Sequence, residues 1–358
     1  MSDNHNTVKT RSEIVFITDA QDCNPNGNPL GENRPRIDPV TRQAAVTDVR
    51  LKRYLRDQLV SDEHGVFVKK TDEGTSGGRA KLALDVLGDI ETKEDLEKVD
   101  DIEAEFLANA TDVRYFGATL SFNKNPDNDL HKVIKEKFNS GNYTGPVQFS
   151  PARSLNAVEL NEETNTLTSV ISTNDEKKVG GFNLDDHRIK YGIFPFHGLV
   201  DEHGAKDTGL THTDVERLDT LCWRALKNQT ISRSKVGQEP RLYVRVEYNQ
   251  PGYHIGDLQN GLKLDRELAS DRNESMSDDA IRNVTDICLD VTGLVDRIAN
   301  AADRIETVHI VGSDYLSVSY DGEQVGVASD VSRLIEESGV AVHNIEVYDE
   351  FESSLPSE

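Results

Sequence analysis

Apolar side chains follow two different periods along this chain, and each period predicts a kind of element. Residues 12–19 alternate between apolar and polar positions and are rich in β-branched side chains, which is typical of a buried first strand. Residues 190–200 and 241–249 predict two further strands. Apolar positions at helical spacing predict helices over about 47–59 and 213–228. The chain is therefore expected to combine helices with strands.

The two predicted helices have distinct surfaces. In the first helix, Leu51, Leu55 and Leu59 fall on one arc, and the opposite arc is basic. The basic residues on that arc are Arg50, Lys52, Arg53 and Arg56. The second helix is expected to begin with a capping box formed by Thr213 and Glu216.

The order of the elements predicts the fold class. Strand, helix, strand, strand, helix, strand with insertions is the order of an α+β domain of the split βαβ, ferredoxin-like or RRM-like type. We expect this core over 11–250, with an inserted acidic lobe at about 61–110 and a projecting loop at about 172–190. The acidic remainder, 251–358, predicts an α/β extension with a helix over 278–304 followed by two or three short strands. This extension either packs on the core or stands beside it.

A long loop follows the first strand. Its sequence, AQDCNPNGNPLGENRPRIDP, has too many prolines and glycines for a helix or a strand ladder. Loops of this length in a compact domain are usually functional or disordered. We therefore expect the loop to carry part of the functional site.

Composition adds an unusual charge. The 64 acidic residues exceed the 40 basic residues and give a net charge of −24, and the 36 Asp outnumber the 28 Glu. Such a surface stays solvated where salt screens charge, so we favour a halophilic cytoplasm over the alternative of an ordinary acidic mesophilic protein. The three cysteines lie far apart without ligand spacing, and neither a leader nor a membrane span is expected from the sequence. We expect a cytoplasmic location, no membrane association and no cofactor.

The charge is distributed unevenly along the chain. Residues 34–56 and 224–245 each carry a net charge of +5, whereas 62–112 carry −9 and 251–358 carry −16. Net charge alone argues against a nucleic-acid ligand, but its distribution argues for one. Two basic segments in an otherwise acidic chain predict a binding face for a polyanion.

Four stretches of the sequence resemble a known family. They are SEIVFITDAQDCNPNGNPLGENRPRIDPVTRQAAVTDVRLKRYLRDQL, YTGPVQFSPARSLN, YGIFPFHGLVDEHGAKDTGLTHTDVERL and TISRSKVGQEPRLYVRVEYNQPGYHIGDL. They are similar to the backbone subunit of the type I-B Cascade complex, which belongs to the CRISPR-associated RNA-binding superfamily with an RRM-like core. The similarity runs from about Arg11 to Asp257 and is thinner over the acidic lobe and the last hundred residues.

The resemblance implies a structural role. In that family several copies stack along a guide RNA into a helical filament, and each copy has a palm, a finger lobe and a thumb-like loop that kinks the RNA. The type I members bind RNA and do not cut it. The implied partners are CRISPR guide RNA, further copies of the chain, other Cascade subunits, and target DNA through the guide.

The residues themselves agree with this role. A protein filament that binds RNA regardless of the RNA sequence needs side chains that contact phosphates and surfaces on which bases stack. Specificity comes instead from base pairing between guide and target. Arginines, lysines and loop amides supply the phosphate contacts. The predicted RNA-binding residues are Asn24, Asn26, Arg34, Arg36, Arg50, Lys52, Arg53, Arg56, Arg153, Ser154, Arg233, Ser234, Lys235 and Arg241. Phe149, Phe182 and Tyr191 are candidates for stacking with bases.

The basic residues also have an ordinary interpretation. A helix face like that of Lys52 and Arg53 is usually a solvated surface, although this is less expected in so acidic a chain. The basic turn at 233–235 can equally pair with neighbouring acids.

A ribonuclease is the alternative function. Asp19, Asp22 and Asp38 have carboxylates that can hold Mg²⁺, and His187 or His197 can act as a general acid or base. Against this, no pattern places the three carboxylates on one face, and aspartates in a proline-rich loop are commonly turn residues. The sequence also lacks the Walker, GxGxxG and GxSxG motifs. We therefore predict that the chain is not an enzyme.

Overall fold

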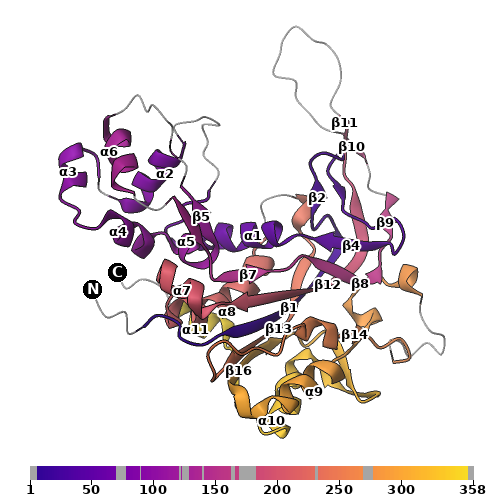
Figure 1. Ribbon diagram of the computed structural model, residues 1–358. Helices are drawn as coiled ribbons and strands as arrows, with labels where there is room; N and C mark the ends of the chain where they lie inside the picture. The colour runs from indigo at the N-terminus through magenta and orange to yellow at the C-terminus, as the bar shows by residue number, and fades with distance from the viewer. Residues whose placement is uncertain are drawn as a thin grey trace.

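A seven-stranded sheet forms the centre of the protein in the computed structural model (Figure 1). The structure describes residues 6–69, 78–88, 90–120, 122, 129–138, 141–162, 166–168, 183–229, 233–268 and 277–353. The strand order is β19-β16-β13-β1-β12-β7, and β9 also pairs with β12. The strands are β1 (Ser12–Cys23), β7 (Val147–Phe149), β9 (Leu160–Asn161), β12 (Arg188–Val200), β13 (Gln238–Tyr248), β16 (Ile305–Gly312) and β19 (Val342–Asn344). All neighbouring strands are antiparallel except β16 and β19.

Side chains of the sheet enter two cores, one on each face. Ile14 and Phe16 of β1 belong to one core, and Val15 and Ile17 belong to the other, because successive side chains of a strand point to opposite faces. Helices α1 (Asp48–Ser61) and α8 (His212–Lys227) cover the first face with their apolar sides. The α+β class, the three long strands and the two helices predicted from the sequence are confirmed.

The predicted cap of the second helix is wrong by two residues. The capping box of α8 is formed by Thr211 and Asp214, and the Thr211 side chain accepts the N–H of Asp214 at 3.1 Å. Thr211 has the extended backbone of an N-cap residue, whereas Thr213 already lies inside the helix. Two Thr-x-x-acid patterns overlap here, and only the backbone conformation distinguishes them.

The acidic C-terminal part covers the second face of the sheet and contributes β16 and β19 to it (Figure 1). Its side chains share one hydrophobic core with Val244 and Val246 of β13. Its remaining main elements are β14 (Lys263–Leu264), β15 (Cys288–Asp290), α9 (Thr292–Asn300), β17 (Ser317–Tyr320), β18 (Glu323–Val327), α10 (Val331–Glu337) and α11 (Val347–Ser353). This part therefore packs on the sheet over residues 258–342.

The helix predicted over 278–304 is wrong. Short 3-10 turns at Asp278–Ala280 and Val284–Asp286 are followed by strand β15, and only α9 is an α-helix. The side chains of Asn283 and Asp286 accept hydrogen bonds from nearby backbone N–H groups, which competes with helix formation. The apolar residues are nevertheless buried, so their spacing indicated burial and not a continuous helix.

An inserted lobe with its own core follows α1. Its elements are α2 (Gly78–Leu87), α3 (Lys93–Glu97), α4 (Ile102–Asn109), α5 (Thr111–Phe116), β5 (Gly117–Thr119), α6 (Asp129–Lys137) and β6 (Asn142–Thr144). Phe67, Phe106 and Phe138 belong to a hydrophobic cluster of this lobe that is separate from the two cores of the sheet. The lobe projects from one end of α1 (Figure 1). Its hydrophobic cluster includes Ile134 and Phe138, which lie beyond the acidic segment 62–112.

Short strands organise the long loop after β1. Within the loop, β2 (Gly27–Asn28) pairs with β3 (Arg34–Pro35). Directly after the loop, β4 (Gln43–Val46) pairs with β8 (Ala152–Ala157). The expectation that proline and glycine exclude any ladder from this loop is therefore wrong, because a two-residue ladder needs few backbone donors.

Two further features complete the fold. Strands β10 (Thr166–Thr168) and β11 (Asn183–Asp185) form a separate pair, and much of the loop predicted at 172–190 lies outside the described residues. Among the helices in the described ranges, none combines the length and the apolar character that a membrane crossing requires.

Candidate nucleic-acid interface

Two buried asparagines fix the shape of the loop between β1 and α1. The Asn24 Nδ2 donates to the backbone carbonyl of Asn33 at 2.7 Å, and the Asn26 Nδ2 lies 3.4 Å from the Oγ1 of Thr47. Gly27 sits where a Cβ atom would collide with Asn33. Asn24 and Asn26, which the sequence predicted to bind RNA, have buried side chains that brace the loop from within.

Three of the predicted RNA-binding arginines line one hollow. Arg34, Arg36 and Arg153 surround a cavity of about 500 Å³ together with Asp38. Arg34 and Arg36 are exposed on either side of buried Pro35, because alternate residues of an extended chain face the same way. The hollow therefore gathers three guanidinium groups from two segments that are far apart in sequence.

The acid partners of these arginines hold them weakly. Arg34 lies 3.2 Å from Glu32, and both side chains are mostly exposed; Arg153 lies 3.7 Å from Asp38. Exposed ion pairs of this kind contribute little free energy. The backbone N–H groups of Thr41 and Val40 donate hydrogen bonds to Asp38 and lower its pKa. The Asp38 carboxylate therefore stabilises the turn that contains it. The arginines of the hollow are available for an anionic ligand.

The basic face predicted on α1 is largely neutralised, so the prediction of a wholly basic face is wrong. Arg53 pairs with Asp57 at 2.7 Å, and Lys52 lies 3.6 Å from Asp48, each one helical turn away. Lys52 is also half-buried, and burial lowers its pKa. The Cζ of Arg50 lies over the ring of Tyr54, 5.8 Å from the ring centroid. The acids that pair with Lys52 and Arg53 are part of the same helix.

Arg56 connects α1 to the inserted lobe. Its Nε donates to Asp112 at 2.8 Å, and Asp112 is fully buried. The same carboxylate accepts the backbone N–H groups of Phe67 and Val68 at 2.7 and 3.1 Å. Arg56, predicted to contact RNA, therefore holds the lobe against the core with a buried ion pair.

The second basic segment of the sequence is mostly internal. Three of its four arginines form ion pairs with acids that are distant in sequence, namely Arg224 with Asp62 at 2.9 Å, Arg241 with Asp19 at 2.8 Å and Arg245 with Asp219 at 2.7 Å. All six side chains are buried or nearly so. The prediction of a second basic surface is wrong at these positions, since charge counted along a sequence does not show which charges pair in the fold.

The turn at 233–235 braces the same loop. Lys235 is buried, its Nζ donates to the backbone carbonyl of Asn24, and burial lowers its pKa to about 8. The carbonyl of Ser234 accepts the Asn24 N–H at 2.7 Å, and the side chain of Arg233 lies outside the described residues. Ser154 is also buried, and its Oγ accepts a backbone N–H of β4 at 3.0 Å. These side chains therefore shape the loop from within.

The aromatic candidates for base stacking are not on the surface. Phe149 and Tyr191 are both buried, so the prediction that they stack on bases is wrong. Tyr191 donates its hydroxyl to Asp19 at 2.9 Å. Phe182 lies outside the described residues.

The three candidate carboxylates lie in different environments. Asp19 is buried in its pair with Arg241, and burial raises its pKa. Asp22 accepts the Asn161 amide at 2.8 Å, and Asp38 accepts two backbone N–H groups of its own turn. Within the described part of the chain, no three histidine, cysteine or acidic side chains are grouped to hold a metal ion.

The two candidate histidines lie near opposite ends of β12. His197 contacts the buried Glu13, with 2.7 Å between Nε2 and Oε1. His187 is buried, and its Nε2 has no hydrogen-bond partner among the described residues. Ten residues of extended strand separate the two rings by roughly 30 Å, so they do not form one catalytic site.

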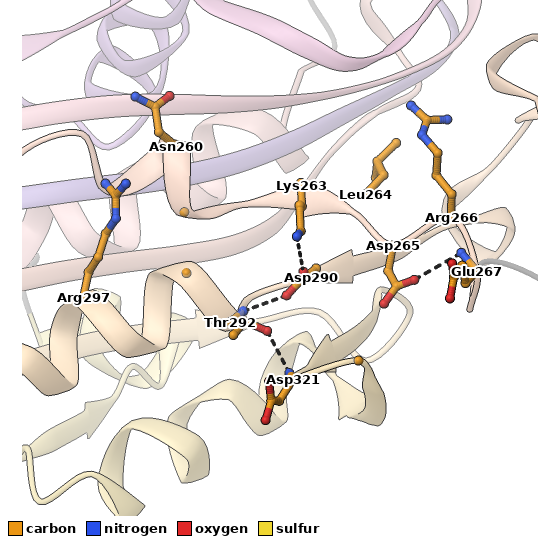
Figure 2. A pocket seen from close by; sticks show the side chains of 13 residues that line it. Asn260, Lys263, Leu264, Asp265, Arg266, Glu267, Asp290, Thr292, Arg297 and Asp321 are labelled. Atoms are coloured by element: carbon orange, nitrogen blue, oxygen red, sulfur yellow. Dashed lines mark hydrogen bonds and ion pairs between the residues drawn. The ribbon is translucent and has the colours of Figure 1, made fainter.

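A second, larger hollow of about 730 Å³ lies in the C-terminal part between β14, α9 and the turn after β17 (Figure 2). Its three cations already have partners. Lys263 lies 3.2 Å from Asp290, Arg266 pairs with Asp278, and Arg297 donates to a backbone carbonyl at 2.6 Å. This hollow therefore mixes both signs of charge and is less suited to a phosphate than the arginine-lined hollow.

Sequence reasoning did not select Arg42 as a site residue. Arg42 is exposed and lines a hollow of about 560 Å³ with Lys190 and Ile37. Ile37 also lines the first hollow, so the two adjoin. Arg42 lies in the basic segment 34–56, and that segment was the signal that could have selected it.

The fold and the site together define a class of protein. It is an α+β protein with an arginine-lined hollow beside a loop that buried side chains hold in place. The family model described as "CRISPR-associated protein Cas7" matches residues 10–292. A curated relative, "CRISPR-associated protein Cas7" of Haloferax volcanii, is 56% identical over 347 residues, which are 96% of this chain and 98% of the relative. The chain belongs to the Cas7 family of CRISPR-associated proteins, and the resemblance noted in the sequence is confirmed at the level of the family.

Two solved structures are similar to this one. The first is a chain from "CRISPR RNA-guided surveillance complex, pre-nicking", which is 12% identical and has a TM-score of 0.48. The match covers 96% of this chain and 99% of that chain. The chain from "CRISPR RNA-guided surveillance complex" is 14% identical, has a TM-score of 0.42 and is covered to 100%, with 92% of this chain covered.

Proposed function

We propose that this chain binds CRISPR guide RNA without reading its sequence and that copies of it assemble along the RNA as the backbone of a type I-B Cascade complex. The observation that carries the proposal is the hollow lined by Arg34, Arg36 and Arg153 in a member of the Cas7 family. Arginine side chains with weak local partners supply phosphate contacts that do not depend on base identity.

The core of the sheet is proposed to be RRM-like. The order β13-β1-β12-β7, with antiparallel neighbours and with α1 and α8 on one face, supports this assignment. It is the order expected when two strand–helix–strand units interleave in a split βαβ domain. The acidic C-terminal part then occupies the sheet face that α1 and α8 leave open.

The proposed partners follow from the same role. Guide RNA binds the copies of the chain, further copies and other Cascade subunits contact one another along it, and target DNA is recognised by base pairing with the guide. Guide and target together supply the sequence specificity, so the protein has no need to read base edges. We place the complex in the cytoplasm and assign it no cofactor.

We propose that the chain is not a nuclease. Asp19 forms a buried ion pair with Arg241, Asp22 accepts the amide of Asn161 from β9, and Asp38 accepts backbone N–H groups of its own turn. The test incubates the purified protein with RNA and Mg²⁺ and compares it with the Asp22→Ala and Asp38→Ala variants. Intact RNA in all three reactions is expected. Products that disappear in either variant would establish the ribonuclease alternative.

The proposed function is tested most simply by the RNA that the protein carries. Tagged protein is purified from its host, and the bound RNA is sequenced. RNAs of one repeat-derived class and of uniform length are expected. Bulk cellular RNA, or none, would contradict the proposal.

A further inference from the structure

Leu30 stands at the tip of the turn between β2 and β3, and its side chain is 98% exposed. A single exposed leucine is common on protein surfaces and by itself indicates nothing. This leucine differs because the turn beneath it is fixed. The N–H of Leu30 donates to Asn28 Oδ1 at 3.2 Å, and the N–H groups of Gly31 and Asn33 donate to the Asn28 carbonyl at 3.0 and 2.9 Å.

The backbone of this turn is also strained. Glu32 and Asn33 have φ angles of 54° and 58°, in the left-handed region that residues with a Cβ atom rarely adopt. Asn33 is tied on both sides, because its carbonyl accepts the amide of buried Asn24 and its own N–H is bonded to Asn28. The fold thus maintains an unfavourable local conformation, and its effect is to present Leu30 to solvent.

The surroundings of Leu30 indicate what it contacts. Asn28 and Gly31, on either side of Leu30, line the same hollow as Arg34 and Arg36. Arg34 and Arg36 face outward two residues apart, which places them roughly 7 Å from each other along an extended backbone. This separation is comparable to that of successive phosphates in an extended single strand. A ligand that engages both arginines therefore lies along the hollow that Asn28 and Gly31 also line, next to the turn that carries Leu30.

We propose that Leu30 is an apolar wedge that contacts a base of the bound RNA, at a step whose phosphates are held by Arg34 and Arg36. This rests on the proposed function, since it requires that RNA occupy the arginine-lined hollow. Proteins that deform nucleic acids insert leucine and similar side chains between bases while cations hold the backbone. A regular row of negative charges fits the paired arginines better than the scattered acids of a protein surface do.

The wedge supplies affinity that salt does not remove. At molar salt the screening length falls to about 3 Å, so phosphate contacts weaken while an apolar contact persists. A preorganised loop adds to this effect, because little conformational freedom is lost when RNA binds.

The test uses the full-length protein and guide-length RNAs that each carry one 2-aminopurine, whose fluorescence rises when the base loses its stacking neighbours. Wild type, Leu30→Ala, the double variant Arg34→Ala/Arg36→Ala and the control Val60→Ala are titrated at about 0.1 M and about 1 M KCl. Val60 is a matched control because it is an exposed aliphatic side chain on α1. A second assay uses an oligonucleotide long enough for one copy only, so that contacts between copies do not contribute.

We expect wild type and Val60→Ala to raise the fluorescence at a regular subset of positions. Leu30→Ala is expected to lose that signal and about tenfold in affinity, equally at both salt concentrations. The arginine variant is expected to lose affinity mainly at low salt.

Three results would overturn the inference, and they are distinguishable. RNA binding by wild type with unchanged affinity and signal in Leu30→Ala removes the wedge but leaves the proposed function intact. Normal binding of the short oligonucleotide with lost assembly on long RNA assigns Leu30 to a contact between copies. Failure of wild type to bind any RNA removes the proposed function itself.

Discussion

Arg34 differs from Arg224 and Arg245 of the second basic segment in the partners that the fold gives it. Arg224 and Arg245 each make two short contacts to a buried carboxylate, whereas Arg34 has one exposed glutamate. A buried ion pair has its charge compensated internally, and an exposed arginine can exchange its partner for a phosphate at little cost. We therefore assign the phosphate contacts to the hollow.

The Arg34→Ala/Arg36→Ala variant measures this assignment. Its affinity for single-stranded RNA is expected to fall, and the slope of log affinity against log salt is expected to decrease by about 0.7 for each phosphate contact removed. Arg333→Ala, which changes an exposed arginine of the C-terminal part, is the control. Filter binding over a range of KCl gives the slope, and an unchanged slope in the double variant would place the phosphate contacts elsewhere.

Glu247 is expected to make stability depend on pH. The hydrogen bond from His309 lowers its pKa to about 2, below the ordinary 4.5. A carboxylate with a lowered pKa in the folded state stabilises the protein above its unfolded pKa and loses that contribution as the pH falls. The free energy of unfolding of Glu247→Gln should therefore be about 3 kcal/mol below wild type at pH 7, and the difference should shrink between pH 4.5 and 2. Urea unfolding at several pH values measures it; a constant difference would contradict the account.

At the scale of elements, the spacing of apolar residues correctly predicted the helices and strands that depend on interactions between residues close in sequence. Helix α1 and strand β1 follow from the positions of apolar residues, which face the core in both. The helix expected over 278–304 failed because Asn283 and Asp286 bond to the backbone and β15 pairs with β17, a partner almost thirty residues later. The second basic surface failed for the same reason, since the acids that pair with its arginines lie on other elements.

The arginine-lined hollow was predictable in part. Its three arginines were all identified as RNA-binding candidates from their residue types and from the resemblance. That Arg153 would join Arg34 and Arg36 depends on the pairing of β4 with β8, which no local pattern specifies. The exposure of Leu30 depends on the turn geometry around Asn28 and Asn33, which the sequence alone does not show.

The link between α1 and the inserted lobe gives a prediction at this scale. Removing Arg56 leaves the buried Asp112 without its cation, so Arg56→Ala should destabilise the protein by about 3 kcal/mol. Arg53→Ala is the matched control, because its partner Asp57 is on the same helix and the pair is partly exposed; it should change stability by less than about 0.5 kcal/mol. Chemical denaturation gives both values, and limited proteolysis should cleave the lobe faster only in Arg56→Ala. Equal effects in the two variants would contradict the assigned role.

At the scale of the whole molecule, the proposed function requires an acidic protein to bind a polyanion. The net charge of −24 opposes RNA binding at low salt, and the segments 62–112 and 251–358 carry most of the excess. Salt screens this repulsion, between the protein and RNA and between neighbouring acidic copies. The same salt weakens the arginine contacts. Affinity must then depend on interactions that salt does not screen, namely loop hydrogen bonds, apolar contact with bases and contacts between copies.

The dependence of assembly on salt tests this account most directly. Filament formation on a guide-length RNA is followed by sedimentation or light scattering from low salt to about molar KCl, where screening is nearly complete. The account predicts that assembly survives or improves across this range, because relief of repulsion between acidic copies offsets the loss of phosphate contacts. A steep and continuous loss of assembly as KCl is added would show that ordinary ion pairing dominates, and would contradict it.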